Sequence, residues 1–237
     1  IVKDAAGNLF VCDRDNHRIR KITPAGVVST FAGGTMGFVD GTGTAARFNQ
    51  PYAITIAPSG DFYVGDRINH SIRKITPAGV VTTLAGNGTA GDQLGTGSAA
   101  MFHEPIGVAA DAFGNIFVAD YINNKIKKIT PAGVVTTFYT ANKVFGLAFD
   151  GAGNLFFTEY SYNLVSKLTP AGSYSIVAGE GGQGGTVDGT GAAARFYFPA
   201  GITVDANGNL YVCDAYNNRI RKITSSGVVT TLAGNTA

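Results

Sequence analysis

The sequence has little charge, no tryptophan, and only two cysteines and two methionines among its 237 residues. Charged residues make up 14% of the chain and hydrophobic residues 45%, a balance too apolar for a disordered chain. The 18 basic and 16 acidic side chains nearly cancel, so the net charge exerts no long-range attraction on nucleic acid or an anionic membrane. Runs of about 18 apolar residues are missing, as is a signal-peptide pattern, so we expect no membrane insertion.

Glycine is abundant, and it marks an internal repeat. The motif Gly-Asn-Leu-Phe-Val at residues 7–11 recurs, with small changes, from residues 60, 114, 153 and 208. Successive copies are 53, 54, 39 and 55 residues apart, so one connection is much shorter than the others. Self-similarity at a period of this size is typical of propellers and solenoids.

Each copy contains four strand signals in a fixed order. In the second copy an apolar inner segment at 53–57 precedes an aromatic strand at 62–64, and strands at 71–75 and 80–84 follow. Such a sheet cannot bury both faces alone, but radially stacked copies cover one another. The sequence therefore predicts an all-β, single-domain β-propeller over residues 1–237, with five four-stranded antiparallel blades. Their approximate bounds are 1–34, 52–86, 105–139, 144–179 and 200–234.

The loop after the second strand carries a family signature. Residues 13–19 and 66–72 each contain Asn-His followed by one polar residue and an isoleucine, while residues 123–124 and 217–218 are Asn-Asn and blade 4 departs with Tyr162-Asn163. These segments resemble NHL repeats, and the resemblance covers nearly the entire chain. It implies a propeller that usually has six blades, so the ring has five blades or these are five of six. Ile1 lies inside a repeat, and we expect the chain to be a piece of a longer protein.

The long connections between blades are expected on one face, which we call the crossover face. Their Gly-Thr-Gly elements indicate turns, because no Lys-Ser/Thr pair of a phosphate loop follows. Thr44 and Ser98 are predicted N-caps of a helical turn. Recurrent pairs predict that each crossover is held by its own ion pair; these are Asp40 with Arg47 and Asp188 with Arg195. Three phenylalanines, Phe48, Phe102 and Phe196, are predicted to pack down as plugs.

Three histidines are the only candidates for a metal site. His17 and His70 occupy equivalent loops, and His103 begins the next inner strand. Three imidazoles can ligate zinc, but equivalent positions in neighbouring blades are expected to lie too far apart for bonds of about 2.1 Å. We therefore expect no metal and no cofactor.

Basic residues recur in every third strand, which raises the alternative of single-stranded RNA binding, known among NHL propellers. The competing interpretation is that their aliphatic stems cover blade edges while their charges meet loop acids at 13, 66, 120, 159 and 214. A residue type that recurs in every blade favours this structural role, so nucleic acid is not the expected partner.

An enzyme is the other alternative. Residues 153–160 resemble repeats of streptogramin lyases, which implies metal-assisted lyase or hydrolase chemistry through His17, His70, His103 and Glu104. Blades 4 and 5 contain no histidine, and no Ser/His/Asp or Cys/His set is legible. The prediction is a protein that is not an enzyme. Cys12 and Cys213 are expected to be free, buried thiols.

The predicted function is a binding or scaffolding propeller whose crossover face meets a protein, peptide or glycan. The missing crossover before blade 4 predicts a notch, and tyrosines at a notch combine apolar area with a hydrogen-bonding tip. The candidate ligand-binding residues are Tyr139, Asn142, Lys143, Tyr160, Tyr162 and Asn163. Low charge and Gly/Thr richness resemble bacterial exported NHL modules, which implies an extracytoplasmic or secreted location.

Overall fold

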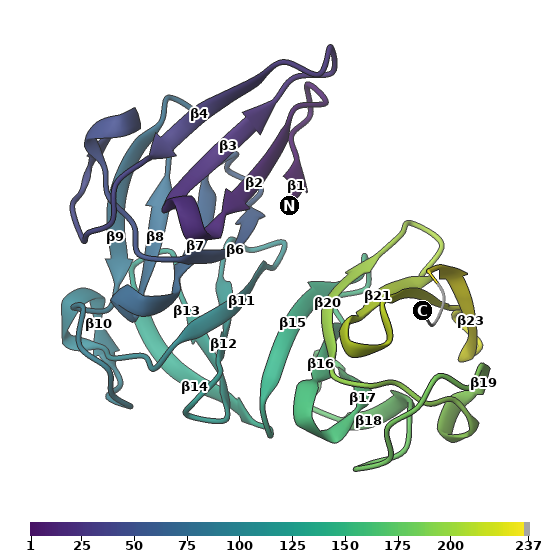
Figure 1. The fold of residues 1–237 in the computed structure, drawn as a ribbon. Helices are drawn as coiled ribbons and strands as arrows, with labels where there is room; N and C mark the ends of the chain where they lie inside the picture. Colours follow the sequence, from purple (N-terminus) through teal and green to yellow (C-terminus); the bar gives the residue numbers. More distant parts are fainter. Residues whose placement is uncertain (235–237) are drawn as a thin grey trace. The chain divides into compact units, whose positions relative to one another are not determined.

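The computed structural model describes residues 1–234 and is an all-β, five-bladed propeller (Figure 1). Five antiparallel sheets of four or five strands follow one another along the chain, which confirms the predicted fold class. The contacts divide the chain into two compact units, unit 1 over residues 1–139 and unit 2 from residue 140 onward. Within the described residues, no helix has the length and hydrophobicity to cross a bilayer.

Unit 1 contains blades 1 to 3. Blade 1 consists of β1 (Val2–Lys3), β2 (Leu9–Asp13), β3 (Arg18–Ile22) and β4 (Val28–Gly33). Blade 2 consists of β6 (Pro51–Ile56), β7 (Phe62–Asp66), β8 (Ser71–Ile75) and β9 (Val80–Ala85), with β5 (Gly41–Thr42) added at its outer edge. Blade 3 consists of β11 (Pro105–Ala110), β12 (Ile116–Asp120), β13 (Lys125–Ile129) and β14 (Val134–Thr140), with β10 (Gly95–Thr96) at its edge.

Unit 2 contains blades 4 and 5. Blade 4 consists of β15 (Val144–Phe149), β16 (Leu155–Glu159), β17 (Leu164–Leu168) and β18 (Tyr174–Ala178). Blade 5 consists of β20 (Pro199–Val204), β21 (Leu210–Asp214), β22 (Arg219–Ile223) and β23 (Val228–Ala233), with β19 (Gly189–Thr190) at its edge. Blade 4 has no fifth strand, as expected from its short connection.

Turn chemistry sets the blade register. Between β8 and β9, Gly79 adopts φ 81° and the Val80 amide donates to the Thr76 hydroxyl at 3.2 Å. A left-handed conformation of this kind is cheap only for glycine. The Pro-Ala-Gly turn therefore fixes Ile75 opposite Val81, and the same pairing recurs as Ile22 opposite Val28 in blade 1.

Short 3-10 helices follow second strands where the family signature lies. They are η1 (Arg14–Asn16), η3 (Arg67–Asn69), η5 (Tyr160–Tyr162) and η7 (Ala215–Asn217). Each ends in a left-handed residue, which is His17, His70, Asn163 or Asn218. Asn tolerates this conformation better than most residues, and His is enriched in it.

The crossover turns differ from the predicted caps. In the first crossover a 3-10 helix, η2 (Gly43–Ala45), begins at Gly43, so Thr42 and not Thr44 is the cap residue, and it makes no side-chain cap bond. The same shift applies to Ser98, which lies inside η4 (Gly97–Ala99). The prediction was wrong because the 3-10 helix starts at Gly43, at φ 57°, two residues earlier than a Thr44 cap requires.

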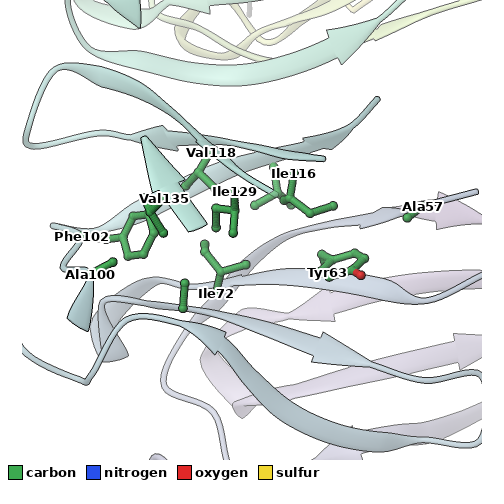
Figure 2. Close-up of a cluster of buried hydrophobic side chains, with 11 residues drawn as sticks. Ala57, Tyr63, Ile72, Ala100, Phe102, Ile116, Val118, Ile129 and Val135 are labelled. Carbon is green, nitrogen blue, oxygen red and sulfur yellow. The ribbon is translucent and has the colours of Figure 1, made fainter. Parts of the chain in front are cut away.

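The core lies between successive blades, under the crossovers. Between blades 2 and 3, the crossover residue Phe102 packs with Ile72 of blade 2 and with Val118 of blade 3 (Figure 2). The equivalent phenylalanines, Phe48 and Phe196, lie in the clusters below their own crossovers. All three are fully buried, which confirms the predicted plugs.

Candidate binding surface

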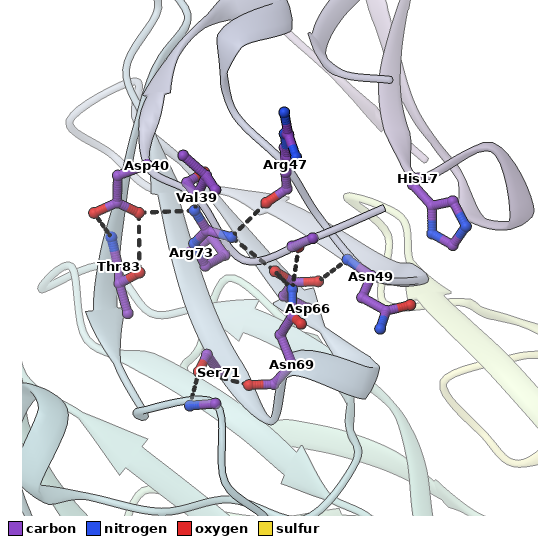
Figure 3. A network of polar contacts seen from close by, with 12 residues as sticks. His17, Val39, Asp40, Arg47, Asn49, Asp66, Asn69, Ser71, Arg73 and Thr83 are labelled. Carbon is purple, nitrogen blue, oxygen red and sulfur yellow. Dashed lines mark hydrogen bonds and ion pairs between the residues drawn. The ribbon is translucent and has the colours of Figure 1, made fainter. Parts of the chain in front are cut away.

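A buried arginine clamps the first crossover onto blade 2. The Arg73 guanidinium donates to the Asp66 carboxylate at 2.8 Å and to the Asp40 carboxylate at 2.7 Å. It also donates to the carbonyls of Val39 and Arg47 at 2.9 and 3.0 Å (Figure 3). Arg73 is 0% exposed. One side chain thus holds a chain segment that lies 26 to 34 residues before it.

The clamp recurs in blades 3 and 5. Arg221 donates to Asp214 at 2.8 Å, to Asp188 at 2.7 Å and to the Val187 and Arg195 carbonyls. In blade 3 the buried Lys127 pairs with Asp120 and Asp92. The predicted pairs within one crossover were therefore wrong. Asp40 and Asp188 reach the third strand of the following blade because that strand presents a buried cation beneath them, while Arg195 pairs instead with Glu180.

Blade 4 lacks both the crossover strand and the cation. At the clamp position it has Ser166, whose hydroxyl donates to the buried Glu159 carboxylate at 2.6 Å. The Tyr174 hydroxyl donates to the same carboxylate oxygen at 2.9 Å. Neutral donors thus satisfy the acid where no crossover has to be held.

Burial decides the role of the basic residues that recur in the third strands. Three of its members, Arg73, Lys127 and Arg221, are wholly buried and ion-paired with second-strand acids. A cation without exposed surface cannot reach a phosphate. Others lie over aromatic rings or pair with turn acids, as Lys74 does with Asp61 at 2.8 Å. The arrangement supports the structural interpretation over the RNA-binding alternative.

The signature histidines hold the next blade's backbone. His17 Nδ1 accepts from the Gln50 amide at 3.2 Å, and His70 Nδ1 accepts from the Glu104 amide at 3.1 Å. Gln50 and Glu104 have φ values of 54° and 53°, so the bond supports a strained residue at the mouth of each inner strand. The Nδ1 atoms of His17 and His70 therefore already accept a backbone hydrogen bond. A metal ion bound at these atoms would have to compete with that bond.

The enzyme alternative requires His17, His70, His103 and Glu104 to act together. The rings of His70 and His103 are 5.5 Å apart in a T-shaped contact, and Glu104 is held by Arg67 at 2.6 Å. Desolvation and the neighbouring His103 lower the pKa of His70. Within residues 1–234 no three His, Cys, Asp or Glu side chains are grouped to hold a metal ion.

Burial shifts the pKa of the Asp66 carboxyl. Desolvation raises its pKa to about 6, even though Asn69, the Asn49 amide and Arg73 all favour the ionised form. Asp188 differs because it is half exposed at the rim: desolvation opposes ionisation there, but hydrogen bonds from Thr231 and the charge of Arg221 outweigh it and lower the pKa. Each arginine clamp thus joins one buried acid and one exposed acid.

Cys12 and Cys213 are both free, as predicted. Their expected burial was wrong for Cys213, which is exposed, and Cys12 is half-buried. Cys12 packs against the hydrophobic cluster between blades 1 and 2, so the two equivalent positions differ in their surroundings, which the repeat pattern alone does not reveal.

The predicted notch residues fall in both units. Tyr139 is a half-buried residue of β14 in unit 1, whereas the other five belong to unit 2. Asn142 is exposed, and Lys143 is half-buried in a left-handed conformation at φ 46°. Tyr162 is 44% exposed, and the buried Asn163 accepts from the Phe198 amide at 2.9 Å.

Tyr160 belongs to a cluster of five rings in unit 2, which we call the aromatic platform. Its members are Phe145, Tyr160, Tyr197, Phe198 and Tyr216. Phe145 stacks on Tyr160 at 4.9 Å, and Phe198 lies 4.9 Å from Tyr160 and 4.7 Å from Tyr216. Tyr216 is 62% exposed and Tyr197 41% exposed. The rings of Tyr197 and Tyr216 are therefore exposed to solvent, and they rest on the other, packed rings of the platform.

Backbone bonds hold the platform in place. The Tyr197 amide donates to the buried Asp214 at 2.7 Å, and the Tyr216 amide donates to the Tyr197 carbonyl at 3.1 Å. The corresponding surface of unit 1 is charged instead, with Arg14 and Arg67 each within 6 Å of the Tyr52 ring. Sequence reasoning found Tyr160 but missed the other four rings. Aligning the residues before each inner strand would have shown Tyr197-Phe198 where blade 3 has His103-Glu104.

Comparison with known proteins gives the family. A model described as the Teneurin NHL domain matches residues 78–237. NHL repeat-containing protein 2 from Gallus gallus is 33% identical over 132 residues, which is 50% of this chain and 18% of that protein. The chain thus spans less than a fifth of that curated relative.

Two solved structures share the fold at low identity. An auxiliary nutrient binding protein from Bacteroides thetaiotaomicron has a TM-score of 0.76 and 17% identity, over 98% of this chain and 56% of that one. Virginiamycin B lyase from Staphylococcus aureus has a TM-score of 0.64 and 18% identity, over 98% and 68%. Binding proteins and enzymes therefore both occur among its structural neighbours, and the fold alone does not separate them. The repeats, the propeller and the match over residues 78–237 together place the chain in the Teneurin NHL domain family.

Proposed function

We propose that this protein is a non-enzymatic binding module whose aromatic platform receives a polypeptide partner. The observation that carries the proposal is the platform itself, where Tyr197 and Tyr216 expose large rings above a packed aromatic base. Tyrosine is enriched at binding hot spots because it offers apolar area, a hydrogen-bonding tip and few rotatable bonds.

Preorganisation supports the proposal. Phe198 is held in a left-handed conformation by the side chain of Asn163, and the Tyr197 amide is anchored on a buried carboxylate. A surface already ordered in the free protein loses little entropy on association. The platform also contains Tyr160, one of the residues expected at the blade 4 notch.

The ring geometry favours a peptide over a sugar. A sugar needs a flat, exposed ring face, but the platform rings cover one another at interplanar angles between 20° and 79°. The exposed side chains of Tyr197 and Tyr216 present ring edges and hydroxyls, and these suit an apolar side chain with its flanking peptide groups. A glycan partner is the alternative that the experiment separates.

The non-enzymatic part of the proposal rests on how the candidate catalytic groups are occupied. Glu104 is ion-paired with Arg67, and its own amide donates to His70. We also propose an extracytoplasmic location, supported by the low charge and the Gly/Thr-rich composition. Fractionation of the source cells, with the protein recovered only in the cytosol, would refute that location.

The test uses a phage-displayed random peptide library and a glycan array against three proteins. These are the wild type, the double variant Tyr197→Ala with Tyr216→Ala, and the control Phe113→Ala, which removes an 85% exposed ring from a turn in unit 1. We expect peptides that bind the wild type and the control and bind the double variant at least tenfold more weakly. Binding of glycans alone, equal binding by the double variant, or no enrichment would overturn the proposal.

A further inference from the structure

Blade 1 has an arginine, Arg20, at the clamp position, but no crossover among residues 1–234 is seated on it. Arg20 lies opposite Val11 and Thr30 in β3, at the position that Arg73 occupies in blade 2. Arg20 is half-buried and lines an open groove of about 550 Å³ together with Val11, Asp13, Arg18, Ile22 and Val28. The neighbouring Asp13 is bonded to Arg18 at 2.8 Å.

The groove is apolar where the equivalent surfaces of other blades are covered. Val28 is 50% exposed, whereas its counterparts Val81, Val135 and Val229 are 1 to 2% exposed. Val11 and Ile22 are also partly exposed, while their blade 2 counterparts Val64 and Ile75 are fully buried. In blade 2 the residues over these positions include Ala46 and Phe48 of the crossover.

The repeats show what the cation at this position does. Blades 2, 3 and 5 have both a seated crossover and a buried cation, namely Arg73, Lys127 and Arg221. Blade 4 has no crossover strand, and its clamp position is Ser166. Within these four blades the cation occurs only where a crossover is seated. Blade 1 has retained the cation, together with the valine and isoleucine that a crossover phenylalanine covers.

We propose that the blade 1 groove is a docking site for a polypeptide segment with crossover chemistry, supplied from outside blades 1 to 5. Such a segment has an aspartate followed eight residues later by phenylalanine, as in Asp40 and Phe48 or Asp188 and Phe196. Arg20 pairs with the aspartate and donates to backbone carbonyls of the segment. The phenylalanine covers the guanidinium as Phe48 does Arg73 at 5.1 Å, and buries Val11, Ile22 and Val28. This site lies in unit 1 and is independent of the aromatic platform.

The chain supplies its own probe. A labelled peptide with the sequence of residues 36–50 carries the aspartate, the phenylalanine and both clamped carbonyls. We expect it to bind the full chain in fluorescence anisotropy, and we expect NMR shifts at Val11, Ile22 and Val28. Peptides with Asp40→Ala or Phe48→Ala should bind at least tenfold more weakly.

A matched pair of protein variants locates the site. Arg20→Ala removes the clamp, whereas Lys21→Ala removes the same charge from the opposite face of β3, since side chains alternate along a strand. The first should weaken peptide binding at least tenfold and the second should leave it unchanged. Equal binding by both variants, or no binding at millimolar peptide, would overturn the proposal. Failure here with retained binding at the platform would leave the proposed function standing.

Discussion

Arg73 is predicted to be the most costly single cation to remove from unit 1. Arg73→Met keeps the length of the aliphatic stem but leaves the buried Asp66 carboxylate without its ion-pair partner and frees the Val39 and Arg47 carbonyls. Removing one member of a buried ion pair costs about 3–5 kcal/mol, mainly because the remaining charge stays desolvated. We expect a loss of free energy of unfolding in that range at pH values near 8.

Arg20→Met is the matched control. It makes the same chemical change at the same repeat position, but Arg20 is only half-buried and Asp13 is already bonded to Arg18. Exposed or partly exposed ion pairs contribute about 0–1 kcal/mol. The difference between the two variants in free energy of unfolding therefore measures the contribution of the contacts with the seated crossover, and not that of the side chain itself.

Acidification distinguishes an orphaned charge from lost packing. The pKa of Asp66 is already raised to about 6, and losing Arg73 must raise it further. A carboxyl whose pKa is higher in the folded state binds its proton more tightly there, so lowering the pH through that value favours folding. The penalty of Arg73→Met should therefore shrink as the pH falls from about 8 toward 5.

Urea unfolding followed by far-UV circular dichroism, at several pH values, measures these differences. The chain has ten tyrosines and no tryptophan, so tyrosine emission provides the second probe. An Arg20→Met loss as large as that of Arg73→Met, or an Arg73→Met penalty independent of pH, would refute the clamp.

Three further predictions concern other parts of the fold. Gly146→Ala would place a Cβ 2.5 Å from the Ala200 carbonyl oxygen and should cost about 1–3 kcal/mol in urea unfolding, whereas Gly151→Ala meets nothing within 4 Å and should change stability by less than ~0.5 kcal/mol. Asp188 has a pKa lowered from 3.8 in the folded state, so its contribution to stability is present above that value and lost as the pH falls below it; Asp188→Asn should flatten the acid limb of the stability curve. Burial and the neighbouring His103 lower the pKa of His70 from 6.5, so stability should fall as the pH drops below 6.5, and an NMR titration that finds a pKa above 6.5 would contradict this prediction.

Predictions from the repeat succeeded where the same contact recurs at the same position of successive repeats. The four strands of each blade, the glycine turns and the phenylalanine plugs follow from periodicity and local backbone preference, and the structure places them as expected. The blade 4 departure was also visible, because residues 140–143 are too few to form the crossover strand present before the other blades.

Predictions failed where a side chain could reach one of two partners. Asp40 and Arg47 recur at constant spacing, which suggested a pair, but Asp40 bonds to Arg73, 33 residues further along. Spacing cannot separate these options, because both recur in each blade with a full crossover and an arginine clamp. The platform was only partly visible for a related reason: Tyr160, Phe198 and Tyr216 come from separate loops.

The sequence by itself determined the propeller, its five repeats and the turns that set each blade's register, since these depend on residues close together in the chain and on a period repeated five times. Only the tertiary structure decided which acid meets which cation, that His17 and His70 accept backbone hydrogen bonds, and that five rings of unit 2 form one surface. The physical reason is that burial and side-chain direction depend on the neighbouring blade, which lies about 30 residues or more away and covers some copies of a position while leaving others, such as Arg20, open.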